Sequence, residues 1–229
     1  AWLNTQGFTN IQTVSAFYWS ATTHVSSPAQ VYYLDFIGNT LFIALKTDTN
    51  YVLAVRFSGG GAVTIPRTGQ TTCYDASNTV TPCSNTAGQD GNYQRGSAWP
   101  SPRFRDNGNG TVTDRLTGLM WQQDGSYQST NWENAISHCA ALTTGGYSDW
   151  RLPNINELAS LVHYGQSNPA VWLNSQGFTG IIISLAYYWS ASTLLNDPKG
   201  GLNVEMNSGR INSSEKHGGY YVIAVRGGQ

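Results

Sequence analysis

Charge is the scarcest property of this sequence. Only 11% of its 229 residues are Asp, Glu, Lys or Arg, and the formal net charge is −1, whereas soluble domains usually carry roughly 25% charged residues. No run of Lys or Arg occurs, so the basic stripe that nucleic-acid binding requires is missing, and we expect no nucleic-acid partner. The near-neutral balance also argues against a strongly anionic ligand. No apolar run approaches the roughly 20 residues that cross a bilayer, so we expect no membrane insertion.

Cysteine is also scarce, with three residues in the chain. Cys73 and Cys83 lie in a Gly/Asn/Thr/Pro-rich stretch, which is typical of a loop closed by a disulfide in an oxidising compartment. The alternative is a pair of free thiols, and we favour the disulfide. Cys139 is then left without a partner.

Aromatic residues, in contrast, are abundant. They make up 12% of the chain, including eight Trp and thirteen Tyr, which is ample for a packed core. With so few charges, the surface must be solvated mainly by Asn, Ser, Thr, Gln and Gly, a composition that suits an extracellular or cell-surface protein. The chain begins at Ala1 without a Met or a signal-like segment, so we interpret this start as processed, cleaved or incompletely observed.

The sequence contains an internal repeat with a constant offset of 170 residues. Segments 1–9, 18–21 and 51–56 reappear as 171–179, 188–191 and 221–226 without a gap. We therefore predict a distal part of a preceding repeat at 1–56, a Gly-rich linker at 57–66 and a complete repeat at 67–229. Between positions 24 and 50 the copies diverge, and only Pro28/Pro198 and Lys46/Lys216 coincide.

The partial copy creates a packing problem. Its strands lack the proximal strands and helices that would bury them, and exposed strand edges seek partners. We expect it to dock on the complete repeat, to pair with another chain or to remain partly disordered. Pairing between chains would give a homo-oligomer or a filament.

The complete repeat has a mixed pattern of strands and helices. Residues 103–114 predict a hairpin around Asn107-Gly108, followed by an apolar strand over 116–122. A capping box at Thr130–Glu133 opens a helix whose buried stripe is Ala135, Ile136, Cys139 and Leu142. A second helix is predicted after Asn154, with Leu158, Leu161 and Val162 inward. Strands around 187–193, 202–206, 209–212 and 220–226 complete an α+β domain with two helices packed on short antiparallel strands, and the partial copy is expected to be all-β.

These segments resemble a known bacterial family. The residues that carry the resemblance are Cys73-Tyr74-Asp75, the 103–114 hairpin, Leu116–Gln122, Gly146–Asn154 with Glu157-Leu158, Tyr188–Ser192 and Val225–Gly228. Together they are similar to the C-terminal domain of the Legionella collagen-like adhesin. The resemblance implies a surface or extracellular protein with a C-type-lectin-like fold, related to formylglycine-generating-enzyme-like domains, and a role in adhesion. Relatives have a Cys where this chain has Ala224, so we expect Cys139 to be a reduced, unreactive core residue.

Catalytic and metal chemistry have weak support in the sequence. Oxygen ligands cluster at Asp106, Asn107, Asn109 and Asp114, which could form a calcium loop, but a simple hairpin explains the same residues. The four histidines lack paired metal-ligand spacing, and no nucleophile or phosphate-loop motif occurs, so we expect no cofactor and no enzyme. Trp19/Trp189 and Phe17/Tyr187 are interpreted as core residues rather than as sugar-stacking surfaces.

The divergent segment 193–219 supplies the better binding candidates. A rigid frame with a variable insert is how many binding loops are built, although exposed connections also drift without selection. The candidates are polar residues: Asn196, Asp197, Lys199, Asn203, Glu205, Asn207, Arg210, Asn212, Glu215 and Lys216. We therefore predict a non-catalytic binding or adhesion module for a glycan or a surface protein. The alternative is a structural subunit that assembles through the partial repeat.

Overall fold

The structure is a computed structural model that describes residues 2–12, 16–55, 65–129, 131–194 and 196–227. In chain order, its elements are α1 (Trp2–Thr5), β1 (Phe17–Thr23), β2 (Gln30–Asp35), β3 (Thr40–Leu45), β4 (Cys73–Tyr74), β5 (Val80–Thr81), η1 (Cys83–Asn85), α2 (Asp90–Tyr93), β6 (Phe104–Asp106), β7 (Thr111–Asp114), β8 (Met120–Gln122), α3 (Trp132–Ala140), η2 (Thr144–Gly146), α4 (Ile155–Ser160), α5 (Pro169–Asn174), β9 (Tyr187–Thr193), β10 (Gly200–Glu205), β11 (Arg210–Glu215) and β12 (Val225–Arg226). The strands are mostly antiparallel and the helices short, which agrees with the α+β prediction. Most of the predicted linker, residues 57–64, lies outside the described residues.

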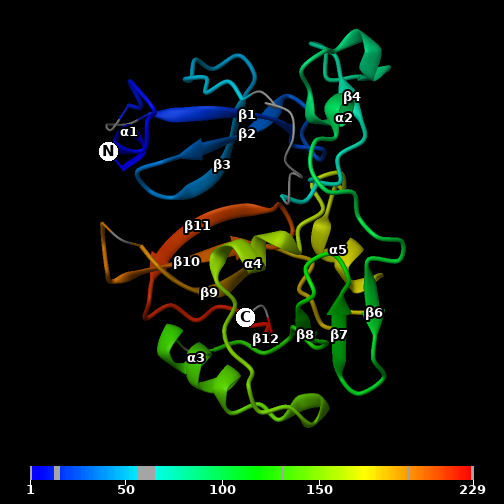
Figure 1. The fold of residues 1–229 in the computed structure, drawn as a ribbon, viewed down its shortest axis with the longest axis vertical. Helices are drawn as coiled ribbons and strands as arrows, with labels where there is room; N and C mark the ends of the chain where they lie inside the picture. Colours follow the sequence, from blue (N-terminus) through cyan, green and yellow to red (C-terminus); the bar gives the residue numbers. More distant parts are fainter. Residues whose placement is uncertain (1, 13–15, 56–64, 130, 195, 228–229) are drawn as a thin grey trace.

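A six-stranded antiparallel sheet joins the two copies of the repeat. Its strand order is β1-β2-β3-β11-β10-β9, so β3 of the first copy pairs with β11 of the second (Figure 1). The paired residues are Leu41 and Ile211, whose numbers differ by the repeat offset (211 − 41 = 170). A residue that meets its own counterpart is the signature of a two-fold interface. The partial copy therefore docks on the complete repeat of the same chain, which is the first of the three outcomes expected from the sequence.

We call residues 2–55 the N-terminal lobe, residues 67–98 the disulfide segment and residues 99–227 the C-terminal lobe. In the C-terminal lobe, a second sheet of order β12-β8-β7-β6 lies beside the distal strands. The main core lies between the two sheets and α4 and α5, with Trp121, Leu158 and Ile223 fully buried. A second cluster around Cys139 and Trp189 lies under α3. Successive side chains of a strand point to opposite faces. Tyr188 of β9 belongs to the main core and Trp189 belongs to the cluster under α3, so both faces of β9 are covered.

The two predicted helices are confirmed in position, with corrections at their ends. Helix α3 is capped by Asn131, whose side chain accepts a hydrogen bond from the backbone of Asn134, so the cap lies one residue later than the sequence indicated. Thr130 lies outside the described residues. The inward position predicted for Ile136 is wrong, because its side chain is exposed whereas Ala135 and Cys139 are buried. Helix α4 begins at the predicted capping box of Asn154 and Glu157.

Other elements differ from the sequence prediction. Helices α2 and α5 were not predicted, and the N-terminal lobe is not all-β, because it contains α1 at the position that corresponds to α5. The strand expected over 116–122 is shortened to β8. Asp114 accepts a hydrogen bond from the backbone of Leu116, and Gly118 has a φ of 76°, so residues 114–119 form a turn.

The disulfide segment packs on the N-terminal lobe. The backbone of Thr23 exchanges two hydrogen bonds with the side chain of Gln70, at 3.0 and 2.7 Å, and Thr22 donates to Asp90 of α2. Figure 1 shows α2 and β4 beside β1 and β2. The opening part of the predicted complete repeat therefore lies against the partial copy.

Segment 222–225 is buried in the C-terminal lobe, whereas the corresponding segment 52–55 of the N-terminal lobe is exposed. In the C-terminal lobe, Val222 and Val225 are 0% exposed, between α3 on one side and the main core on the other. Their counterparts in the N-terminal lobe, Val52 and Val55, are 74% and 96% exposed. The N-terminal lobe thus keeps the distal strands of the fold without the proximal half that would cover them.

Candidate functional site

The ten predicted ligand residues fall into three groups along the β10–β11 ladder. The ladder pairs Gly200 with Glu215 at one end and Glu205 with Arg210 at the other, with Asn203 opposite Asn212 between them. Residues at the two ends are separated by the length of a six-residue strand, which is roughly 20 Å. The candidates therefore do not form one site.

At the first end, the β9–β10 connection lies beside the end of β11. The backbone N–H of Lys216 donates to the carbonyl of Lys199 at 2.9 Å, and the Lys216 ammonium donates to Thr193 at 3.0 Å. Four candidates at this end are exposed: Asn196, Asp197, Lys199 and Glu215. They form a mixed-charge polar surface next to well-packed strands, and we call it the loop surface.

Lys216 has a structural contact that the sequence left unexplained. Its ammonium lies 4.1 Å from the centroid of the Trp132 ring, and the Trp132 indole N–H donates to the carbonyl of Ser190 at 2.7 Å. The matching lysine of the N-terminal lobe, Lys46, lies 5.9 Å from the centroid of the Tyr74 ring. A cation over an aromatic face is favourable in both lobes. The coincidence of Lys46 and Lys216 in an otherwise divergent segment therefore has a physical cause.

The other end of the ladder is held by an ion pair. The Arg210 guanidinium donates from Nε to Oε2 of Glu205 at 2.6 Å, and the Glu205 side chain is 2% exposed. Asn203, in the middle of the ladder, is fully buried, and its amide donates to Ser214 at 3.0 Å. A surface ligand would not reach Asn203 or Glu205. Asn207, Arg210 and Asn212 are half-buried, so they are less accessible than the loop surface.

The four residues of the weak calcium-loop candidate all have hydrogen-bond partners within the protein. Asp114 is fully buried, and its carboxylate accepts two hydrogen bonds from Arg103, at 3.1 and 2.7 Å. Asp106 caps the hairpin turn at Gly108 and accepts a bond from Gln123, while the Asn107 and Asn109 side chains bond to neighbouring threonines. In the part of the chain that the structure describes, no three His, Cys, Asp or Glu residues gather as metal ligands.

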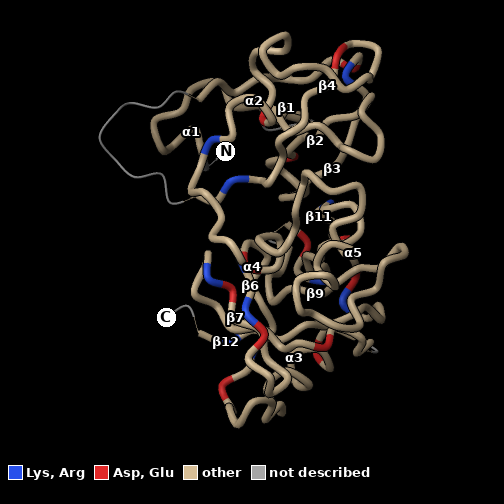
Figure 2. The backbone as a smooth tube through the Cα atoms, turned by 90° about the vertical axis from the view of Figure 1, so that its right-hand side faces the viewer, with Lys and Arg blue, Asp and Glu red and all other residues tan. Residues whose placement is uncertain are grey.

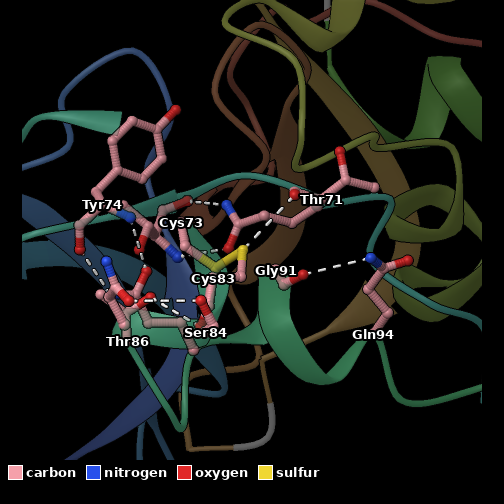
Figure 3. The surroundings of a disulfide bond; sticks show 12 residues. Thr71, Cys73, Tyr74, Cys83, Ser84, Thr86, Gly91 and Gln94 are labelled. Carbon is pink, nitrogen blue, oxygen red and sulfur yellow. Dashed lines mark hydrogen bonds between the residues drawn. A yellow bond between two sulfur atoms is a disulfide. The ribbon is translucent and has the colours of Figure 1, made fainter. Parts of the chain in front are cut away.

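The predicted disulfide between Cys73 and Cys83 is present (Figure 3). Within the disulfide segment, the Gln89 side chain donates to the Tyr74 carbonyl and accepts from the Tyr74 backbone N–H, and the Tyr74 ring lies under Lys46 of the N-terminal lobe. Tyr74 under Lys46 thus occupies the place that Trp132 of α3 has in the C-terminal lobe. Cys139 is free and buried, and burial raises the pKa of its thiol to about 12, which agrees with an unreactive core residue.

Two histidines are packing residues. His163 lies edge-on between Trp99 and Trp172, with ring centroids 4.7 Å from each, and burial with the Arg103 charge lowers its pKa to about 4. His138 stacks on Tyr127 with ring centroids 3.5 Å apart, and burial lowers its pKa. Among the described residues, neither histidine belongs to a group of three or more His, Cys, Asp or Glu residues that could hold a metal ion.

The repeated aromatic residues have different environments in the two lobes. Trp189 is fully buried, as expected for a core residue, and Tyr220 packs on it with ring centroids 4.7 Å apart. Phe17, expected in the core, is instead 36% exposed and forms one wall of an open cavity together with Tyr33 and Tyr51. The sequence prediction overlooked this cavity because it interpreted Phe17 as a core residue and looked for exposed ligand-binding residues mainly in segment 193–219. The signal that could have found it is the replacement of Tyr220 by Asn50 in the repeat.

The charged residues give no further site. Figure 2 shows them scattered over both lobes, with acidic and basic residues interspersed. The longest helix in the described part of the chain, α3, has nine residues, so none of these helices is suited to crossing a membrane.

Comparison with known protein families identifies the family to which most of the C-terminal lobe belongs. The family of the Lcl C-terminal domain matches residues 110–226, which is just over half of the chain and nearly all of the C-terminal lobe. No curated protein matches the sequence. The match confirms the resemblance drawn from the 103–114 hairpin, the Trp150–Asn154 segment and the closing Val225-Arg226. This chain belongs to the Lcl C-terminal domain family.

Proposed function

We propose that this chain is a non-catalytic binding and adhesion module of a secreted or cell-surface protein. Its membership in the Lcl C-terminal domain family supports a surface-associated role. The low charge and the structural disulfide suit an extracellular environment. A C-type-lectin-like architecture, implied by the sequence resemblance, is part of this proposal.

The loop surface is the proposed ligand-binding site in the C-terminal lobe. The observation that carries this assignment is its exposure: Asn196, Lys199 and Glu215 are open to solvent, whereas Asn203 and Glu205 of the same divergent segment are buried. Both ends of the loop are fixed, because Leu194 and Gly200 are hydrogen-bonded at its neck and Lys216 bonds to Lys199. A polar loop on a rigid frame loses little conformational entropy when it binds.

The test is binding of the labelled full chain to a glycan array, and to cells before and after protease treatment. The variant Asn196→Ala/Lys199→Ala/Glu215→Ala removes three polar side chains and leaves the net charge unchanged. We expect at least a tenfold loss of binding. The matched control, Ser26→Ala/Ser27→Ala, changes the corresponding loop of the N-terminal lobe and should bind normally. Unchanged binding by the triple variant would reject the loop surface as the site.

A second candidate function is assembly. The edge of β3 is already paired with β11, so an assembly contact would use the exposed apolar segment at Val52 and Val55 instead. Sedimentation velocity over a hundredfold concentration range tests this candidate. Association of the wild-type chain, together with a monomeric Val52→Ser/Val55→Ser variant, would support this candidate. A strictly monomeric chain would eliminate it.

A further inference from the structure

The N-terminal lobe contains an open cavity lined by residues of β1, β2, β3 and the segment that follows β3. Its volume is about 610 Å³, which is within the usual range for small-molecule sites. Three aromatic residues, Phe17, Tyr33 and Tyr51, belong to the lining, together with the polar residues Gln30, Asp48 and Asn50. The cavity lies outside residues 110–226, which the family match covers.

The internal repeat explains why the cavity is open. In the C-terminal lobe, Tyr220 fills the corresponding space and packs on Tyr187 and Trp189, with ring centroids 5.3 and 4.7 Å apart. The residue at the matching position of the N-terminal lobe is Asn50, which is too short to reach the aromatic wall. The position that is buried Asn203 in one lobe is Tyr33 in the other. Compared with the C-terminal lobe, the N-terminal lobe therefore lacks the tyrosine that plugs this space, at Asn50, and has an additional aromatic ring, at Tyr33.

The aromatic wall is a preformed stacking surface. The Phe17 and Tyr33 ring centroids are 4.8 Å apart with the planes inclined by 48°, and Tyr33 lies 6.1 Å from Phe42 on the next strand. Aromatic faces are electronegative, so they attract the weakly positive C–H groups of a flat, saturated ring. Because these side chains come from paired β-strands, little conformational entropy is lost on binding.

The polar rim offers hydrogen bonds to hydroxyl groups. Within the described residues, the side chains of Gln30, Thr49 and Asn50 have no hydrogen-bond partner, and one oxygen of Asp48 accepts a bond from the backbone of Leu45. Amides and a carboxylate provide donors and acceptors at once, which is what a polyhydroxylated ligand requires. Among the described residues that line the cavity there is no Lys, Arg or His, and Asp48 is the one carboxylate. A sulfated, phosphorylated or uronic-acid ligand would therefore meet a negative charge without a cation to pair with it.

We propose that this cavity is a binding site for a neutral saccharide, in which a pyranose ring stacks on Phe17 and Tyr33 while its hydroxyls bond to Gln30, Asp48 and Asn50. The site is separate from the loop surface, and neither depends on the other. The ligand contacts are few, so the dissociation constant for a single sugar is on the order of 1 mM.

Saturation-transfer NMR on the full chain tests the site. The probes are the methyl glycosides of glucose, galactose, mannose and N-acetylglucosamine, with glucuronic acid as the charged comparison. We expect saturation transfer to the ring C–H protons of at least one neutral glycoside and a much weaker signal for glucuronic acid. Absence of binding by all neutral probes, or equal binding of glucuronic acid, would overturn the proposal.

The C-terminal lobe supplies the variants. Asn50→Tyr restores the plug and Tyr33→Asn restores the residue of the other lobe, and each should weaken neutral-sugar binding at least tenfold. Both positions are partly exposed, and a thermal melt that matches the wild type verifies folding. Unchanged sugar binding by both folded variants would refute the site. The loop variant Asn196→Ala/Lys199→Ala/Glu215→Ala should keep full saccharide binding in the cavity, so failure of this site and failure of the loop surface are distinguishable.

Discussion

The same substitution at repeat-equivalent positions should have very different costs in the two lobes. Val222→Ala removes two methyl groups from a side chain that is 0% exposed. At about 0.8 kcal/mol for each buried group, the transfer cost is about 1.6 kcal/mol, and the cavity left behind raises it to about 2–3 kcal/mol. Val52→Ala removes the same groups from a side chain that is 74% exposed, so we expect a loss of about 0.4 kcal/mol.

Urea unfolding followed by tryptophan fluorescence measures both values, because the chain has eight Trp. The two lobes share one sheet, so we expect a single transition with similar slopes for both variants and the wild type. Equal losses for the two variants would refute the reasoning, since they would mean that segment 51–55 is packed as tightly as segment 221–225. The measurement is repeated at two protein concentrations, because self-association through Val52 would bury it.

Three further predictions concern stability. Replacing Cys73 and Cys83 by Ser should lower the free energy of unfolding, measured in urea, by about 2–3 kcal/mol for a loop of this size. It should also speed amide exchange at the end of β1, where Thr23 bonds to Gln70 of the disulfide segment, and unchanged exchange would show that this segment does not protect β1. Asp114→Ala leaves the buried Arg103 without its partner and should cost about 3–5 kcal/mol, whereas a loss below about 1 kcal/mol would show that water reaches the arginine. The pKa of His163 is lowered from 6.5 to about 4 in the fold, so the unfolded chain binds more protons between these values and stability is lost as the pH falls from 6.5 towards 4. Allowing for partial exposure of the ring, the loss is about 1–2 kcal/mol, and urea midpoints in His163→Gln should fall less steeply over this window.

Local signals in the sequence were sufficient for the hairpin and for α4. The Asn107-Gly108 pair marks the 103–114 turn, and Asn154 with Glu157 marks the start of α4, because both depend on neighbouring residues alone. Helix α5 has a comparable signal in Asn168-Pro169, an N-cap followed by proline at the first helical turn. It was overlooked because residues 171–179 were interpreted only as repeat sequence.

The docking of the lobes could not be predicted from the sequence. Pairing of Leu41 with Ile211 joins residues 170 positions apart, and no local pattern specifies which strand edge will meet which (211 − 41 = 170). Burial of Asn203 and Glu205 has the same origin. Polar side chains in a divergent segment indicated an exposed surface, but Glu205 is neutralised by Arg210 across a tight turn, and the ion pair lies within the packed sheet. Charge of opposite sign at paired hairpin positions was the available signal.

The two lobes are one architecture completed in two ways. In the C-terminal lobe, α3 supplies Trp132 to Lys216, and Tyr220 closes the space beside Trp189. In the N-terminal lobe, the disulfide segment supplies Tyr74 to the matching lysine, and nothing among the described residues fills the space that Asn50 leaves open. The cation–aromatic contact is present in both lobes and its lysine is the same in both, whereas the residues at the positions of Asn50 and Tyr33 differ between the lobes. Positions that differ between lobes with the same backbone pairing are therefore where function is expected, and Asn50 and Tyr33 satisfy this criterion within a cavity, as Asn196 and Lys199 do on a loop.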